Sequence, residues 1–348
     1  MNICILLGGE SSERRVSLVS GLAVGTTCRE LGHTVWFLDP ATGDEERSHD
    51  LPPAEQPFLD LVERWEQRTP DPGLIPESLA RVRAAKPDCV LILLHGGAGE
   101  GGTVQALLDL WRIPYSGSGH VASAVAMDKV VTKRILERLE IPVAAELLWT
   151  APLHGPCTPP SADEIAGLGG YPIVAKPIAG GSTLGVTIVR DPSMWAEAWR
   201  NAQGEIDPDR GLLLEQFIPG QELTVGLLDG QPLPVVEIRP GEGFYDYRSK
   251  YTAGASQYIV PAEIPTAVAE RMQVWAARAC TAIGVRDVAR VDFRLAPDGR
   301  IACLEVNTIP GMTPTSLVPK AAKAIGIDFK DVVSRLIARA AARGRPAA

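Results

Sequence analysis

The chain has 348 residues, a net charge of −8 and 45% hydrophobic residues. That length predicts two or three domains, and the composition is ordinary for a globular protein with a buried core. The negative charge disfavours nucleic acid and anionic membranes as partners. The sequence contains neither a secretory signal nor an apolar run of about 18 residues, so we expect no membrane span and a cytoplasmic location.

The six cysteines stand at positions 4, 28, 89, 157, 280 and 303. Three of them, Cys4, Cys89 and Cys303, lie in apolar, strand-like runs, and no CxxC pair occurs. This pattern favours buried free thiols in a reducing compartment over a disulfide or a metal site.

The first third of the chain alternates strand and helix patterns. Apolar runs at 3–7 and 34–38 are separated by a helical pattern, which predicts a parallel α/β unit. The next predicted elements are a surface loop at 40–60, a helix entered at Pro76, a buried strand at 89–94 and a helix at 103–111. A break rich in Gly and Pro at 114–119 predicts the first domain boundary near residue 117.

The rest of the chain reads as α+β. We expect one long helix over 121–139, and a loop at 151–160. Strand patterns follow at 171–176, 185–190, 212–217, 222–228, 288–295 and 301–306. Further helices are predicted over 265–283 and 328–343. The predicted units are therefore 1–117, 118–211 and 212–348, the last of them carrying the polar site described next.

Four polar residues near the C-terminus form the most informative pattern. Arg290 and Asp292 are two residues apart on one predicted strand, and Glu305 and Asn307 are two apart on the next. Because side chains alternate along a strand, all four point to one face of a hairpin. Carboxylate and amide oxygens suit Mg²⁺, and an adjacent arginine suits negative charge that develops in a reaction. The alternative is a surface salt bridge on a solvated sheet.

Three further segments carry phosphate- or carboxylate-binding features. Lys176 ends a strand before the Gly-Ser loop at 180–185, whose amides could face phosphates, although a plain hairpin would look the same. Lys129 lies inside the predicted helix, where a solvated lysine is the alternative. After Asn307, a Gly- and Pro-rich loop leads to Ser316 and Leu317, which would suit a carboxylate or simply begin a helix.

Together these strings resemble the D-alanine–D-alanine ligases of the ATP-grasp superfamily. The matching strings are LLGGESSERRVSLVSG at 6–21, LHGGAGEGGTVQ at 94–105, IPYSGSG at 113–119, AMDKVVTKR at 126–134, VAKPIAGGSTLGV at 174–186, FYDYRSKYT at 244–252, ARVDF at 289–293 and LEVNTIPGMTPTSLVP at 304–319. The resemblance implies an α/β fold of three domains, in which an N-terminal parallel-sheet (pre-ATP-grasp) domain precedes two ATP-grasp subdomains with ATP between them.

The resemblance also implies a role for each matching residue. The implied magnesium ligands are Asp292, Glu305 and Asn307. The oxyanion would be held by Arg290 and the amide of Gly311. The implied ATP-binding residues are Lys129, Lys176, Thr183, Leu184, Glu215, Phe217, Ile218 and Glu222.

For the amino-acid substrates, the resemblance implies a hydrogen-bonded triad of Glu13, Ser182 and Tyr251, with His95 near the first substrate. Lys250, Ser316 and Leu317 would meet the carboxylate of the second. Blander readings stay open: Glu13 as a first-turn carboxylate favoured by the helix dipole, His95 as a turn histidine and Tyr251 as a packed aromatic.

The sequence departs from the family pattern at several positions. Arg15 stands where a second acidic residue is usual, and Gly101 replaces the usual Asp after Glu100. Gly180 and Gly181 precede Ser182, and Thr183 with Leu184 replaces the commoner Ser-Val. Gln216 stands where Lys or Glu is usual in the adenine segment. None of these changes removes a proposed catalytic group.

By resemblance, the reaction is ATP-dependent ligation of two D-alanines through an acyl phosphate, for peptidoglycan precursor synthesis. It would use two Mg²⁺ ions, with Mn²⁺ as a substitute, in a homodimer. The 180–185 and 244–257 loops are candidate lids over the acyl phosphate, and Tyr251 favours a peptide over an ester product. The alternatives are an ATP-grasp ligase or carboxylase with other substrates, and a nucleotide-responsive regulator that has lost turnover.

Overall fold

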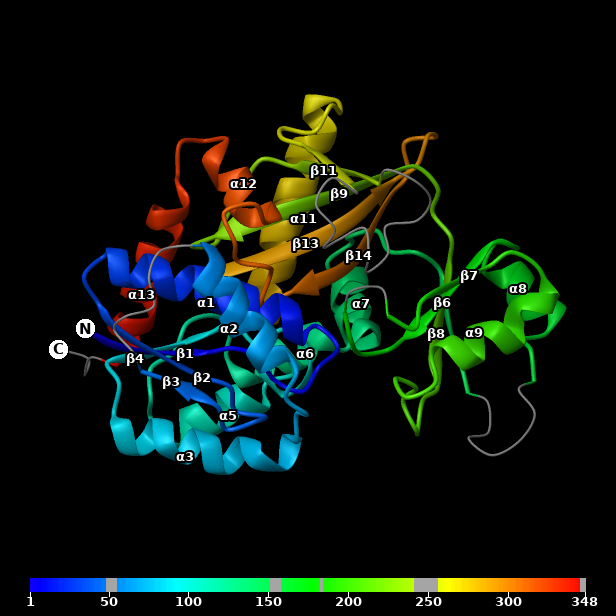
Figure 1. Cartoon of the computed structure of the whole chain (residues 1–348). Coiled ribbons are helices and arrows are strands. Elements are labelled where there is room, and N and C mark those ends of the chain that lie inside the picture. The colour runs from blue at the N-terminus through cyan, green and yellow to red at the C-terminus, as the bar shows by residue number, and fades with distance from the viewer. Residues whose placement is uncertain (48–54, 151–157, 182–183, 241–255, 345–348) are drawn as a thin grey trace.

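The computed structural model describes residues 1–47, 55–150, 158–181, 184–240 and 256–344. These residues build three sheets with surrounding helices (Figure 1). The N-terminal unit lies on the left, the central unit on the right and the C-terminal sheet above and between them. In the part of the chain so described, no helix is both long enough and apolar enough to cross a bilayer.

The N-terminal sheet has the order β3-β2-β1-β4. Strands β1 (Asn2–Leu6), β2 (Thr34–Leu38) and β4 (Cys89–Ile92) are parallel, as predicted, and β3 (Glu45–Glu46) adds an antiparallel edge. The three parallel strands are continuous apolar runs because helices cover both faces of the sheet.

Alternate residues of these strands serve the two layers. Ile3 and Ile5 face α1 (Arg14–Glu30) and α2 (Glu55–Glu66), whereas Cys4 and Leu6 face α3 (Ile75–Ala85) and α5 (Thr103–Leu110) (Figure 1). The short elements η1 (Pro72–Leu74) and α4 (Gly97–Glu100) connect them. The predicted 40–60 loop was wrong in part, because β3 and the start of α2 lie within it. Strand β3 pairs through its backbone and needs no apolar side chains, so its sequence carries no strand pattern.

The predicted helix over 121–139 is two helices, α6 (His120–Met127) and α7 (Lys129–Arg138). Between them Asp128 adopts an extended conformation, and its side chain accepts a hydrogen bond from the backbone N–H of Val131 at 3.0 Å. An aspartate in this position is a favourable N-cap, so the chain restarts its helix there. Lys129 consequently occupies the first turn of α7 and not a helix interior.

The central sheet is antiparallel, with the order β5-β8-β6-β7. Its strands are β5 (Glu146–Trp149), β6 (Ile173–Pro177), β7 (Thr187–Val189) and β8 (Leu212–Gln216). Helices α8 (Ala162–Gly167) and α9 (Trp195–Asn201), with η2 (Pro192–Met194), complete the unit. Because β8 pairs with β5 and β6, we propose that the central unit ends after β8 and not at residue 211.

The C-terminal sheet has the order β12-β11-β9-β13-β14, and β10 pairs with β9. Its strands are β9 (Gln221–Leu228), β10 (Gln231–Pro232), β11 (Val236–Pro240), β12 (Ser256–Ile259), β13 (Val288–Leu295) and β14 (Ile301–Asn307). Helices α11 (Thr266–Ile283) and α7 share its core. Helices α12 (Leu317–Lys323) and α13 (Phe329–Arg343) follow, and α13 packs against β4 and α1 of the N-terminal unit (Figure 1).

Candidate active site

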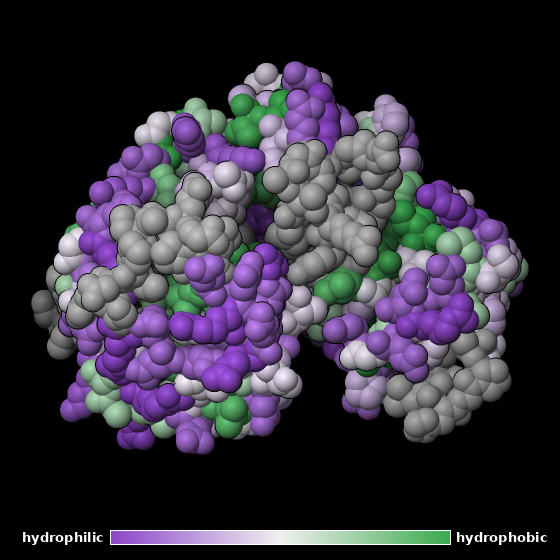
Figure 2. Space-filling model, in the orientation of Figure 1, coloured by the Kyte–Doolittle hydropathy of each residue, from purple (hydrophilic) through white to green (hydrophobic). Residues whose placement is uncertain are grey.

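A pocket of about 910 Å³, open solvent at its mouth included, lies between the central and C-terminal sheets. A cavity of this size can enclose a nucleotide. The space-filling view shows the molecule notched between the N-terminal and central units (Figure 2). The predicted site residues that line the pocket are Lys129, Lys176, Leu184, Glu215, Phe217, Ile218, Glu222, Asp292 and Glu305. Residues far apart in sequence therefore meet at one cavity.

The predicted metal ligands face one another across β13 and β14. The register pairs Asp292 with Glu305 and Arg290 with Asn307. Arg290 donates to both carboxylate oxygens of Asp292, from Nε to Oδ1 at 2.9 Å and from Nη2 to Oδ2 at 3.0 Å. Asn307 donates to Asp292 Oδ2 at 3.0 Å. The four predicted side chains are thus in one cluster on one sheet face.

The cluster suits a hard divalent cation. Its two carboxylates and one amide are oxygen donors, and Asp292 and Glu305 also line the pocket. Three protein oxygens leave coordination positions for phosphate oxygens and water, which is the usual arrangement for Mg²⁺. The donor set therefore fits the ion that the sequence predicts.

Lys129 joins this cluster to the Gly-rich loop. Its ammonium donates to the carbonyl of Gly180 at 2.6 Å and lies 3.5 Å from Glu305 Oε2. The Gly180 amide in turn donates to the sulfur of Met127 at 3.3 Å. The lysine predicted to hold phosphate is therefore buried at the point where the loop, the cluster and α7 meet.

Lys176 and Glu215 are paired at the central-sheet side of the pocket. Their Nζ and Oε2 atoms are 2.7 Å apart, and Glu215 Oε1 lies 2.8 Å from Lys133 Nζ. Burial lowers the pKa of Lys176. Burial alone would raise the pKa of Glu215, but the charges of Lys176 and Lys133 outweigh it and the pKa falls. Glu215 is therefore ionised at neutral pH.

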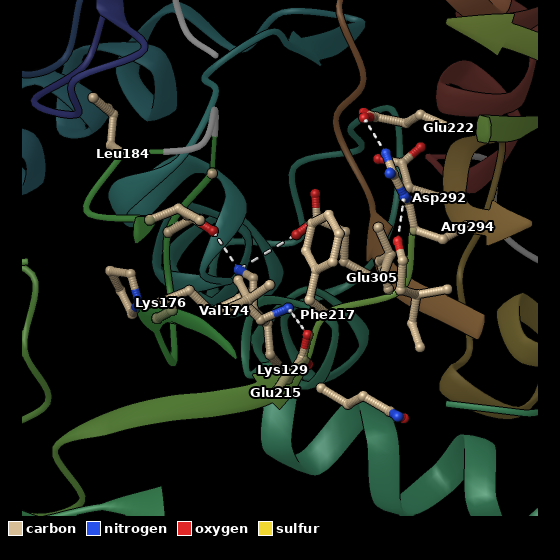
Figure 3. A pocket seen from close by; sticks show the side chains of 18 residues that line it. Lys129, Val174, Lys176, Leu184, Glu215, Phe217, Glu222, Asp292, Arg294 and Glu305 are labelled. Carbon is tan, nitrogen blue, oxygen red and sulfur yellow. Dashed lines mark hydrogen bonds and ion pairs between the residues drawn. The ribbon is translucent and has the colours of Figure 1, made fainter. Parts of the chain in front are cut away.

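Glu222 and Arg294 lie across the pocket from Lys176 (Figure 3), and Phe217 and Ile218 also line it. Arg294 donates to Glu222 Oε2 at 3.2 Å and to the carbonyl of Ile218 at 3.1 Å. This arginine fixes the Ile218 backbone and the Glu222 carboxylate relative to each other. Leu184 lies across the pocket from them in Figure 3.

Glu13 and His95 lie in the N-terminal unit, and Glu13 lies beside the Gly-rich loop. A methyl carbon built at Gly181 would stand 2.5 Å from Glu13 Oε2, so the loop backbone closely approaches this carboxylate. His95 is buried, and its Nε2 lies 3.4 Å from the hydroxyl of Ser20. Burial lowers the pKa of His95 and keeps the ring neutral at pH 7.

The loop that follows Asn307 reaches the same region. Ser20 Oγ accepts a hydrogen bond from the amide of Met312 at 3.1 Å, next to Gly311. Ser316 Oγ accepts from the amide of Thr313 at 3.0 Å and would lie 3.2 Å from a methyl carbon on Gly311. Leu317 begins α12 immediately after Ser316. The predicted oxyanion and carboxylate contacts therefore share one short loop.

Four predicted site residues, Ser182, Thr183, Lys250 and Tyr251, lie outside the described residues. Two of the departures have local partners. Arg15 forms an ion pair with Glu66 of α2, and the amide of Gly101 donates to the carbonyl of Gly97 at 2.8 Å. Gln216 lines the pocket beside Phe217.

Sequence reasoning missed Lys133, Arg294 and Glu100. Arg294 could have been found from its period-two spacing after Arg290 and Asp292, which places it on the same face of β13. Lys133 lies four residues after Lys129, on the same side of α7. Glu100 was missed because two of its three backbone partners, Thr308 and Ile309, are more than 200 residues away.

Glu100 is a buried carboxylate that joins two units through backbone amides. It accepts from Gly96 at 3.1 Å, from Thr308 at 3.1 Å and from Ile309 at 3.2 Å. Burial is the largest effect on its pKa, which rises to about 7 from an ordinary value of 4.5. The loop carrying His95 is thereby tied to the end of the strand carrying Asn307.

We expect Glu100→Gln to change how stability depends on pH. Because the native carboxyl has the higher pKa, the unfolded state binds fewer protons between about pH 4.5 and 7, and wild-type stability falls as the pH rises through that window. Relative to the variant, the wild type should lose roughly 2 to 3 kcal/mol between pH 5 and 8. Urea unfolding of both proteins at pH 5 and at pH 8 measures this. An equal difference in unfolding free energy between wild type and variant at the two pH values would contradict it.

These three sheets, with a pocket between the two antiparallel ones, define an ATP-grasp fold preceded by a parallel α/β domain. The family model described as D-ala D-ala ligase N-terminus matches residues 2–118, and the D-ala D-ala ligase C-terminus model matches residues 136–338. The chain therefore belongs to the D-alanine–D-alanine ligase family.

Curated relatives and solved structures agree with this assignment. The chain is 43% identical to the D-alanine–D-alanine ligase of Gloeobacter violaceus over 97% of this chain and 99% of the relative. It is similar to the D-alanine–D-alanine ligase of Bacillus anthracis complexed with ATP, with a TM-score of 0.71, 28% identity and coverage of 99% and 98%. It also resembles the VanG D-Ala:D-Ser ligase of Enterococcus faecalis, with a TM-score of 0.77, 27% identity and coverage of 97% and 98%.

Proposed function

We propose that the protein joins two D-alanines into D-alanyl-D-alanine, driven by ATP, to supply peptidoglycan precursor synthesis. The observation that carries this proposal is the convergence of nine predicted nucleotide and metal residues on one pocket of a chain from this family. The B. anthracis relative was solved with ATP, which supports ATP as the nucleotide.

The proposed reaction has two steps. A carboxylate oxygen of the first D-alanine attacks the γ-phosphorus of ATP, and ADP leaves. The amine of the second D-alanine then attacks the acyl carbon, loses a proton, and inorganic phosphate leaves. Mg²⁺ bound at Asp292, Glu305 and Asn307 would neutralise phosphate charge. The protein itself provides positioning and charge stabilisation and no covalent nucleophile.

We assign the remaining roles by position. Lys129 and Lys176 would hold the phosphates, and Phe217, Ile218 and Glu222 the adenosine. Glu13 and His95 would meet the first D-alanine beside the Gly-rich loop, while Arg290 and the amide of Gly311 would stabilise the oxyanion. Ser316 and Leu317 would bind the carboxylate of the second D-alanine, which places both amino acids between the N-terminal unit and the 308–316 loop.

The test is product identification by mass after incubation with ATP, Mg²⁺ and single or paired D-amino acids. We expect phosphate release that depends on D-alanine, and a product of the mass of D-alanyl-D-alanine. D-serine and D-lactate are the informative competitors as second substrate, because the fold is also similar to a D-Ala:D-Ser ligase. Exclusive formation of D-alanyl-D-serine or of the D-lactate ester would reject the proposed product.

We propose a homodimer that acts in the cytoplasm, where ATP is available and thiols stay reduced. The five described cysteines are all buried and free of disulfides, which supports the second point. Light scattering combined with size-exclusion chromatography would measure the assembly.

A further inference from the structure

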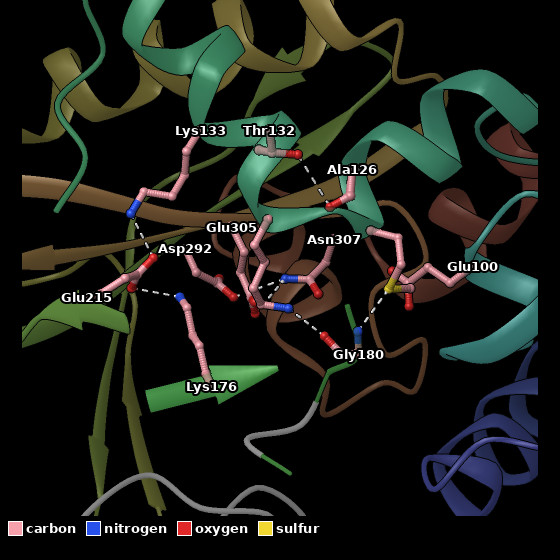
Figure 4. A network of polar contacts seen from close by, with 12 residues as sticks. Glu100, Ala126, Thr132, Lys133, Lys176, Gly180, Glu215, Asp292, Glu305 and Asn307 are labelled. Carbon is pink, nitrogen blue, oxygen red and sulfur yellow. Dashed lines mark hydrogen bonds and ion pairs between the residues drawn. The ribbon is translucent and has the colours of Figure 1, made fainter. Parts of the chain in front are cut away.

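A buried charge network lies directly behind the nucleotide pocket (Figure 4). Lys133 is its centre: the residue is fully buried, and its ammonium lies 2.8 Å from Glu215 Oε1, 2.8 Å from Glu146 Oε2 and 2.9 Å from the carbonyl of Ala144. Glu146 and Glu215 are register partners on β5 and β8. Two carboxylates are therefore held side by side by one lysine.

Lys133 does not line the pocket. Its partner Glu215 does, and so does Lys176, which pairs with Glu215. Glu215 contacts Lys133 through Oε1 and Lys176 through Oε2, and Glu215 and Lys176 both border the cavity. The chain of contacts thus runs from Lys133 outside the pocket, through Glu215, to the ammonium of Lys176 inside it.

We propose that Lys133 is a positioning residue for nucleotide binding: it anchors Glu215 from behind and so leaves Lys176 available to the bound nucleotide. This inference rests on the proposed use of ATP. In this structure, Lys176 and Glu215 form an ion pair with each other. A phosphate group that draws Lys176 away leaves Glu215 with Lys133 as its cation, so the carboxylate stays compensated while the second lysine moves.

A purely stabilising role explains the network less well. Buried ion pairs contribute little net stability, because desolvation of the charges offsets their attraction. Removing one partner, in contrast, strands a buried charge. Without Lys133, Glu215 would depend on Lys176 alone and would hold that lysine against the nucleotide.

Lys133→Met should therefore weaken ATP binding, measured by calorimetry with ATP and Mg²⁺ and no amino acid. We expect the Kd to rise about tenfold or more, because that change corresponds to the free energy that one hydrogen bond to a charged group contributes. Arg134→Met is the matched control: Arg134 is exposed and pairs with Glu146 and Glu137, not with Glu215, so its ATP affinity should equal that of the wild type.

The decisive measurement is a double-mutant cycle with Glu215→Gln. If Lys133 acts through the Glu215 carboxylate, Lys133→Met added to Glu215→Gln should change the Kd by less than threefold. Additive losses, or an unchanged Kd in Lys133→Met, would overturn the proposal. If Lys133→Met does not fold, the double variant Lys133→Met/Glu146→Gln takes its place in the cycle. The second substitution removes the negative charge of Glu146, which would otherwise be buried without Lys133.

These outcomes are separable from those of the proposed function. If the Kd for ATP rises in Lys133→Met as expected, but the wild type forms no D-alanyl-D-alanine, the proposed function is rejected and the inference stands. If the wild type forms D-alanyl-D-alanine and the Kd for ATP is unchanged in Lys133→Met, the inference is rejected and the proposed function stands.

Discussion

Arg290→Ala should reduce the turnover of the ligase by about 10² or more, while ATP binding stays within a few-fold of the wild type. The reason is geometric. Arg290 does not line the pocket, but its Nε lies 2.9 Å from Oδ1 of Asp292, which does. Its guanidinium therefore lies at the edge of the pocket, next to the proposed metal ligands. A cation placed there acts mainly on charge that develops during the reaction.

The measurement is steady-state kinetics with D-alanine, paired with calorimetry for ATP. Arg300→Ala is the control, because Arg300 lies exposed in the β13–β14 turn and pairs only with Asp298 among the described residues. Near-normal turnover in Arg290→Ala would reject its role. A fall in ATP affinity as large as the fall in turnover would place Arg290 in ground-state binding instead.

Glu305→Gln should also lower turnover by about 10² or more, and should raise the Mg²⁺ concentration needed for half-maximal activity. Glu305 stands opposite Asp292 and 3.5 Å from Lys129, so it is the carboxylate that a metal ion and the phosphate lysine would share. Removing its charge weakens the donor set without changing the shape of the side chain.

A metal titration of activity, checked by direct Mn²⁺ binding, separates this effect from misfolding. Glu263→Gln changes an exposed carboxylate paired with Arg239 and should leave both curves unchanged. A Glu305→Gln enzyme with wild-type Mg²⁺ dependence would show that Glu305 is not a ligand.

Much of the fold could be predicted from local patterns. The buried runs of β1, β2 and β4 and the alternation along β13 are set by which faces are covered, so their periods appear in the sequence. The hairpin prediction was the most useful one, but spacing and the turn do not set the register. Continued regularly from Leu295 and Ile301, the pairing would put Asp292 opposite Leu304, and a β-bulge between Asp292 and Phe293 shifts it to Glu305.

Elements held by backbone pairing or by a single cap were predicted poorly. Strand β3 consists of two glutamates that pair with β2, so its sequence has no apolar pattern from which a strand could be predicted. The break between α6 and α7 depends on the side chain of Asp128, which a pattern of apolar residues does not register.

The sequence by itself determined which site residues share a face of each strand, because Arg290 and Asp292, and likewise Glu305 and Asn307, are two residues apart. The β-bulge between Asp292 and Phe293 that brings these two pairs to one face of the sheet is a feature of the folded structure. Only the tertiary structure decided what stands behind them. Lys133 meets Glu215, and Glu100 meets Thr308, across 82 and 208 residues of chain. Such contacts form when separate units pack and bury a charge, and a buried charge takes whichever partner the packing brings within reach.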